Sequence, residues 1–406
     1  MLNSERMILP LMWISMTIAE NLWAIFGVEL APIFYLVIVA MAWDIASRTP
    51  YSSSASCALF LAVCLRIIEF FDPSAGIYFA RICLLAFVFA VAGSASYGKN
   101  PNLLHRQLVI YLGFSIPFML LQIIGVGSFV YGWNTELMHD TSVMTIDDVG
   151  HFIDVTTFPT LFIGFDDLIY SMGQGRPVGL MYSNNVLSVF ISIAIAINVI
   201  ITKSSRLHPS HFIVVTAAIL AMSKLAFSVA MIVYFGYFLF GNKPQQKLGL
   251  KLIFIFGAGL CLYYILFPGL FIANFSYEML MTSFFLRFID MAQALGITSV
   301  QSNFLESISF LGSLYNEDAT GYSFYALILR SEISVLIGIV LTILGLLYHA
   351  RIKQLKATGK QTHLYVIVFM ICALTLVAVP FFANPSFQLL IGFALFPLFR
   401  KLWGMN

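Results

Sequence analysis

The stretch RPVGLMYSNNVLSVFISIAIAINVIIT, residues 176–202, joins a polar segment to a long apolar run. A helix needs roughly 20 mainly apolar residues to cross the hydrocarbon core of a bilayer, and residues 180–202 provide such a run. Runs of similar length recur along almost the entire chain. The stretch therefore predicts one span of an all-α polytopic membrane protein.

The composition points the same way. Of 406 residues, 60% are hydrophobic and 10% are charged, which leaves too few charged side chains to cover a water-soluble globule. No linker or repeat divides the chain, so residues 1–406 are expected to form a single integral-membrane domain. The five cysteines lie inside apolar runs without metal-type spacing, and we expect them to be small core residues.

The apolar runs predict about twelve transmembrane helices. They cover roughly 7–25, 31–46, 55–71, 76–97, 107–131, 180–202, 210–222, 225–241, 250–272, 326–349, 363–382 and 386–399. The stretch 209–241 is interpreted as two short helices that meet at Ser223 and Lys224. One long tilted helix is the alternative, but it would place the following lysines on the wrong side of the membrane.

Basic residues collect in cytoplasmic loops of membrane proteins. With twelve spans and both termini in the cytoplasm, fifteen of the 21 lysines and arginines fall on the cytoplasmic side. The same topology places two long loops, residues 132–179 and 273–325, on the periplasmic side. Both mix aromatic and apolar residues, so we expect short helices and turns in them.

The remaining six cations are the informative ones. They fall in outer loops or near the outer ends of predicted spans: Arg66, Arg81, Arg176, Lys224, Arg287 and Arg330. A cation at membrane depth is costly and normally faces the protein interior or a polar cavity. Structural alternatives are local ion pairs for Arg66, Arg81 and Arg287, and interfacial snorkelling for Lys224 and Arg330. Together, the six resemble a set that neutralises a polyanion at the outer boundary.

Three short motifs follow one another in order. Arg176, Pro177, Val178, Gly179 and Leu180 precede Asn184 and Asn185; Met222, Ser223 and Lys224 interrupt a later apolar run; Arg287 lies in FFLRFIDMAQALG. This order resembles that of bacterial O-antigen polymerases of the Wzy type and of the related O-antigen ligases. The resemblance covers roughly residues 107–350 and includes the long second outer loop. Lys224 departs from it, because the family usually has arginine there.

The resemblance implies a glycosyltransferase of the bacterial inner membrane whose active site faces the periplasm. It would join oligosaccharide repeats carried on undecaprenyl diphosphate, with no metal and no cofactor. The residues implied for the site are Arg176, Lys224 and Arg287 for the diphosphate, Arg330 and Arg81 around them, Asp290, His151 or Glu306 as base, and Asn184, Asn185, Gly179, Ser223 and Tyr182 for substrate. Helix capping by the two asparagines and an interfacial position for Tyr182 are structural alternatives.

Partners and competing functions follow from the same comparison. The resemblance implies lipid-linked donor and acceptor, membrane lipids, a possible chain-length regulator protein and no nucleic acid. An O-antigen ligase is the first alternative, although ligases usually carry a histidine in the second outer loop and residues 273–325 contain none. A lipid-linked oligosaccharide flippase or transporter is the second, although transporters place charges near the midplane of two similar halves.

Overall fold

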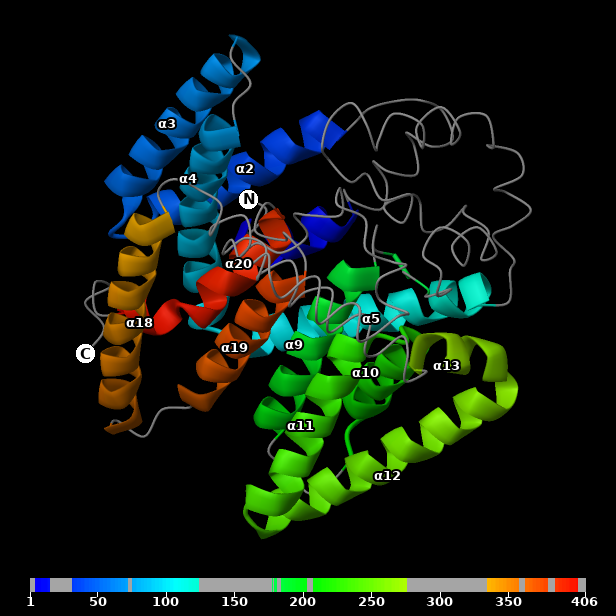
Figure 1. Cartoon of the computed structure of the whole chain (residues 1–406). Helices are drawn as coiled ribbons and strands as arrows, with labels where there is room; N and C mark the ends of the chain where they lie inside the picture. Colours follow the sequence, from blue (N-terminus) through cyan, green and yellow to red (C-terminus); the bar gives the residue numbers. More distant parts are fainter. Residues whose placement is uncertain are drawn as a thin grey trace, which may run out of the picture. The chain divides into compact units, whose positions relative to one another are not determined.

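The computed structural model describes residues 4–14, 31–71, 75–123, 177, 179–180, 184–202, 207–275, 334–357, 362–378 and 384–400 (Figure 1). All regular structure in these ranges is helical: residues 4–14, thirteen further α-helices and one π-helical turn, Ser94–Gly98. The chain forms two compact units, Met1–Arg48 with Ala95–Phe275, and Thr49–Ser94 with Ser276–Asn406. We describe each unit by itself.

The first unit holds the segment at residues 4–14 and most of the long helices. These are α2 (Ala31–Ser47), α5 (Pro101–Ile123), α9 (Asn184–Thr202), α10 (Pro209–Leu220), α11 (Lys224–Phe240), α12 (Lys243–Leu266) and α13 (Pro268–Phe275). The second unit holds α3 (Ser52–Phe71), α4 (Ala75–Gly93), α18 (Ser334–Ala357), α19 (Thr362–Ala378), α20 (Pro385–Ala394) and α21 (Phe396–Arg400).

Local signals in the sequence fix where several helices begin. The Asn242 side chain accepts a hydrogen bond from the Gln245 amide, and the Gln245 side chain accepts one from the Asn242 amide, so α12 starts with a capping box. In the same way, Asn384 accepts from the amides of Ser386 and Phe387 at the start of α20. These caps satisfy amide groups that have no partner inside the helix.

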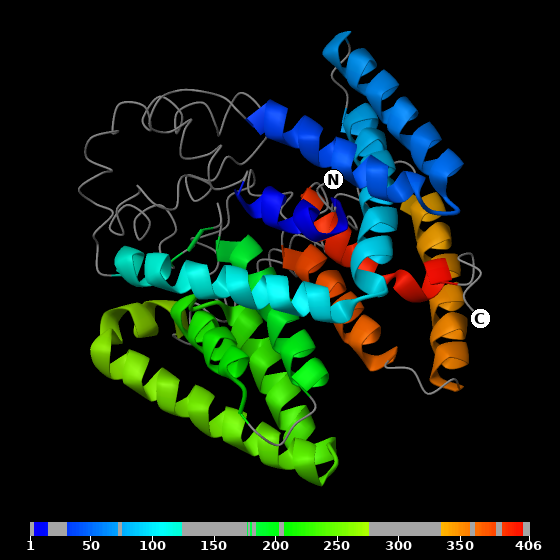
Figure 2. The same ribbon diagram turned by 180° about the vertical axis from the view of Figure 1, so that it is seen from behind.

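Helices α11 and α12 form an antiparallel hairpin (Figures 1 and 2). The rings of Phe227 and Phe256 lie 5.4 Å apart at one end of the pair. At the other end, Gly249 packs so closely that a Cβ on it would lie 2.7 Å from the Phe238 amide nitrogen. Glycine at this position allows the two helix backbones to approach each other.

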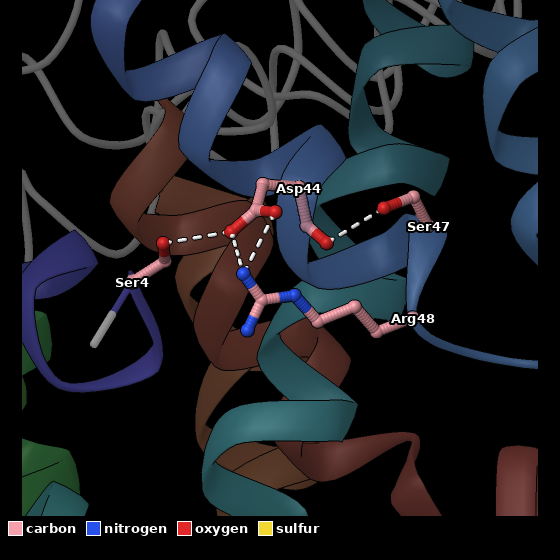
Figure 3. Close-up of polar contacts among 4 residues, drawn as sticks. All are labelled: Ser4, Asp44, Ser47 and Arg48. Atoms are coloured by element: carbon pink, nitrogen blue, oxygen red, sulfur yellow. Dashed lines mark hydrogen bonds and ion pairs between the residues drawn. The ribbon is translucent and has the colours of Figure 1, made fainter. Parts of the chain in front are cut away.

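The N-terminal segment is tied to two helices of the first unit. Figure 3 shows that Ser4 donates to the Asp44 carboxylate at 2.8 Å, while Arg48 binds both oxygens of that carboxylate at 2.8 and 2.6 Å. The Gln107 side chain of α5 donates to the Arg6 carbonyl at 2.7 Å. These bonds place residues 4–14 between the end of α2 and the start of α5.

In the second unit, α3 and α4 pack together and α20 crosses α4 (Figure 2). Glycines lie at this crossing on both helices: a Cβ on Gly93 would overlap the Leu389 backbone, and one on Gly392 would overlap the Ala90 backbone. The Tyr348 hydroxyl of α18 also donates to the Ala394 carbonyl of α20 at 3.1 Å. Small residues are what allow membrane helices to pack at such short range.

The helices indicate a membrane protein. By length and composition, three helical stretches among the described residues can cross a bilayer, Ala80–Gly98, Pro101–Leu121 and Lys243–Leu266, and several shorter helices are also apolar. Large apolar side chains stand exposed along α18, from Ile339 to Leu347. A continuous apolar surface of this kind is stable in contact with lipid and unfavourable in contact with water.

Two details differ from the sequence-based expectations. The apolar stretch 250–272 is not one helix, because α12 already begins at Lys243 and ends before Pro268, where α13 starts. Proline cannot continue the helical hydrogen-bond ladder. The expectation of buried cysteines was also wrong for Cys57 and Cys261, which are exposed.

Candidate functional site

The Gly179 turn, which we define as Pro177, Gly179 and Leu180, directly follows Arg176 in the chain. Pro177 and Gly179 are buried. Gly179 has φ +63°, in the left-handed region that side-chain-bearing residues rarely adopt. A Cβ on it would lie 3.1 Å from the Ser115 Cβ and 3.2 Å from the Met119 Cγ of α5. The turn thus needs glycine for both its backbone conformation and its contact with α5.

Ser115 belongs to a small group of buried polar side chains on α5. The Ser115 and Tyr111 hydroxyls face each other one helical turn apart, and neither makes a hydrogen bond of standard geometry within the described residues. The Trp13 ring lies 4.3 Å from the Tyr111 ring and 5.6 Å from the Phe190 ring. Residues 4–14, α5 and α9 therefore meet at Tyr111, one helical turn before the Ser115 side chain that lies next to the Gly179 turn.

A polar network joins α5, α9 and α10 at their other ends. The Asn198 side-chain oxygen accepts from His105 Nε2 at 2.8 Å and from the Ser210 hydroxyl at 2.7 Å. Thr202 donates to the Asn198 carbonyl at 2.7 Å, and its hydroxyl lies 3.2 Å from His211 Nε2. The network fixes these three helices to one another through side chains that are mostly buried.

These contacts also give the helix directions. His105 of α5 and Ser210 of α10 share Asn198, and further along both helices Gly113 lies against Ile213, where a Cβ would be 3.9 Å away. From this shared point, α5 and α10 both lead away from the Asn198 network. Helix α9 reaches the network near its end, at Asn198, while Phe190, nearer its start, approaches Tyr111 through Trp13.

The break between α10 and α11 falls where the sequence predicts it. Met222 is buried and has φ +49°, an uncommon conformation for a residue with a side chain. Ser223 is also buried, and its hydroxyl accepts from the Ala226 amide at 3.4 Å, so Ser223 caps α11 and Lys224 is the first helical residue. The single long helix considered as the alternative is ruled out.

Several predicted site residues lie away from the Asn198 network along their own helices. These are the Gly179 turn against the second half of α5, the start of α9 at Asn184 and Asn185, and the break before Lys224 after the end of α10. Asn184 and Asn185 occupy the helix start expected from the sequence. Their side chains lie outside the described part of the chain, so their capping or binding role stays a prediction.

Other predicted residues fall elsewhere. Arg81 is half-buried on α4, in the second unit. Outside the described residues lie Arg176, Tyr182, Arg287, Asp290, Arg330, His151 and Glu306. Their roles remain predictions.

Trp13, Tyr111 and Ser115 were not identified from the sequence. The available signal was the spacing of Tyr111 and Ser115, two polar groups four residues apart in an apolar helix, which places both on one face. The contact of that face with Gly179 involves residues more than 60 positions apart and has no local signature.

Comparisons with protein-family models, curated proteins and solved structures find no match to this chain. Among the described residues, no group of histidine, cysteine or carboxylate side chains has a metal-binding arrangement. What the described site offers is a fixed turn after an arginine and a lysine at a helix start. Such groups can bind and orient an oxyanion at the edge of a membrane.

Proposed function

We propose that this protein is a membrane glycosyltransferase that polymerises lipid-diphosphate-linked oligosaccharide repeats into O-antigen or a related surface polysaccharide. The observation that carries the proposal is the Gly179 turn: directly after Arg176, the chain packs against α5, and a second predicted ligand, Lys224, begins α11 after the break at Ser223. A fixed turn next to an arginine suits recognition of a phosphate group, because the planar guanidinium needs a defined orientation for two parallel hydrogen bonds.

The proposed topology has about twelve spans with both termini in the cytoplasm of a bacterium. The distribution of lysines and arginines supports it. So does the break at Ser223, because it allows residues 209–241 to form two short helices and keeps Lys243, Lys247 and Lys251 on the cytoplasmic side. In this topology the Gly179 turn and Lys224 face the periplasm.

The reaction transfers a glycan from its carrier to a hydroxyl group. The bond between the anomeric carbon and the diphosphate oxygen breaks, a bond from that carbon to the acceptor oxygen forms, and the hydroxyl proton passes to a base. Arg176, Lys224 and Arg287 stabilise the negative charge that develops on the departing diphosphate. Asp290, His151 and Glu306 are the candidates for the base.

The substrates implied by this reaction are a donor and an acceptor that both carry undecaprenyl diphosphate. Arg330 and Arg81 would add positive charge around them, and Asn184, Asn185, Ser223 and Tyr182 would contact sugar or phosphate. A separate regulator protein would set the length of the product. No cofactor is part of this scheme.

The test uses purified protein in detergent with a short oligosaccharide linked to a lipid diphosphate. Wild-type protein should give a ladder of longer lipid-linked products, and Arg176→Ala should lower its rate about 10- to 100-fold, the effect of losing one charge-assisted bond pair. Arg351→Ala is the matched control, because Arg351 binds Gln354 on an exposed surface of α18 and should leave the ladder unchanged.

Two other outcomes would reject the polymerase. Transfer of the intact glycan to a different acceptor, without lengthening, would identify a ligase. Movement of unchanged substrate across liposome membranes would identify a flippase.

A further inference from the structure

We infer that Ser115 and Met119 of α5 are positioning residues for the proposed reaction: they hold the Gly179 turn, and through it the chain that carries Arg176. The inference rests on the proposed function. It adds to the site two side chains that neither the charge pattern nor the motif order indicates. We call these two side chains the docking face of α5.

Contact geometry is the first argument. A Cβ on Gly179 would lie 3.1 Å from the Ser115 Cβ and 3.2 Å from the Met119 Cγ, both tighter than ordinary van der Waals contact. Gly179 and Pro177 are buried as well. The turn therefore packs so close to the docking face that a side chain on Gly179 would not fit without a shift, and a larger side chain at position 115 would displace the turn.

The shape of α5 supports the same conclusion. Pro117 lies between the two docking residues, inside the helix. It has no amide hydrogen to donate to the Gly113 carbonyl and restricts the backbone of this turn. On the same stretch, Gly113 approaches Ile213 of α10, the helix that ends at the break before Lys224. Helix α5 thus contacts both elements that lead to the proposed diphosphate ligands.

Two substitutions separate positioning from simple stability. Ser115→Ala keeps the Cβ that lies next to Gly179 and removes a hydroxyl that makes no hydrogen bond of standard geometry within the described residues, so it should behave like wild type. Ser115→Leu extends into the turn, and it should lower kcat/KM about 10- to 100-fold per folded molecule, as small displacements of binding groups do. Met119→Ala removes the second contact and serves if Ser115→Leu does not fold.

A cross-link tests the contact without any activity. In a chain with its five native cysteines replaced, Ser115→Cys combined with Gly179→Cys should form a disulfide on mild oxidation. A Cβ at position 179 lies 3.1 Å from the Ser115 Cβ, and the shift of a few tenths of an ångström that any side chain at 179 requires brings the pair into the roughly 3.5–4.5 Å range of disulfides. The matched control pairs Gly179→Cys with Gly257→Cys, since no described residue, Gly179 included, lies within 4 Å of a Cβ at Gly257. The control pair should stay reduced.

The outcomes are distinguishable. A cross-link only in the first pair, with loss of kcat/KM in Ser115→Leu and wild-type values in Ser115→Ala, is the expected result. Absence of the cross-link, or full activity of both Ser115→Leu and Met119→Ala, overturns the inference and leaves the polymerase proposal intact. A cross-link in a protein whose wild type makes no polymer overturns the proposed function, and the positioning role with it.

Discussion

Asn198 of α9 joins this helix to α5 and α10 through hydrogen bonds. Its replacement tests how much these bonds contribute to the stability of the first unit. The residue is 2% exposed, and its side-chain oxygen accepts hydrogen bonds from two other helices, through His105 and Ser210. Asn198→Leu keeps a side chain of similar size and removes the acceptor. We expect it to lower the free energy of unfolding by about 1–2 kcal/mol.

The magnitude follows from which donors lose their partner. The Ser210 hydroxyl has another acceptor within reach, since His208 Nδ1 lies 2.9 Å away. Among the described residues, His105 Nε2 makes no hydrogen bond other than the one to Asn198, and an unsatisfied buried donor costs about 1–3 kcal/mol. The lower part of that range applies, because His105 is only half-buried and hydrogen bonds between membrane helices average about 0.6 kcal/mol.

The assay is reversible unfolding of the purified protein in detergent micelles, followed by the helical circular dichroism signal. Ser192→Ala is the matched control on the same helix, because the hydrogen bond that the Ser192 hydroxyl makes among the described residues goes to the Ser188 carbonyl of α9 itself. It should change the free energy by less than about 0.5 kcal/mol. The double variant His105→Leu with Asn198→Leu should recover stability relative to Asn198→Leu, since no donor then remains unsatisfied. Wild-type stability of Asn198→Leu would refute the reasoning.

Two further predictions concern helix packing and the helix break. Gly249→Ala should lower the free energy of unfolding by about 1–3 kcal/mol, because the new Cβ would meet the Phe238 amide nitrogen at 2.7 Å. Gly257→Ala on the same helix meets no described residue within 4 Å and should stabilise the protein by up to about 1 kcal/mol. Equal effects of the two substitutions in thermal unfolding would contradict this prediction. Ser223→Ala should lower the free energy of unfolding by about 1 kcal/mol, because it removes the side-chain oxygen that caps the Ala226 amide. Ser223→Asn should restore most of this stability. Equal stability of the two variants would show that the cap contributes nothing.

Much of the helical pattern could be predicted from hydropathy. The break at Ser223 was predicted because a lysine interrupts two apolar runs and the following lysines need to stay on one side of the membrane. The early start of α12 was not, because hydropathy counts apolar residues and its first turns contain Lys243, Gln245, Gln246 and Lys247. The helix begins there through the cap formed by Asn242 and Gln245, a signal visible in the sequence as Asn followed three residues later by Gln.

The site was only partly predictable for a physical reason. Gly179 lies in a left-handed turn and Ser223 caps a helix, and short sequence motifs can identify positions of both kinds. Ser115 and Met119 act through packing against a turn far away in sequence, so their importance depends on the distance between two segments. The Asn198 network could not be predicted for the same reason, because its polar residues meet only when three helices pack together.

The measurement that tests the central claim most directly is the product stoichiometry of the purified wild-type protein with one defined lipid-diphosphate-linked oligosaccharide. Mass spectrometry should find products that differ by whole repeats on a single carrier, with one free lipid diphosphate released for every glycosidic bond formed. Unchanged substrate with no released carrier, under conditions in which the protein is folded, would contradict the account.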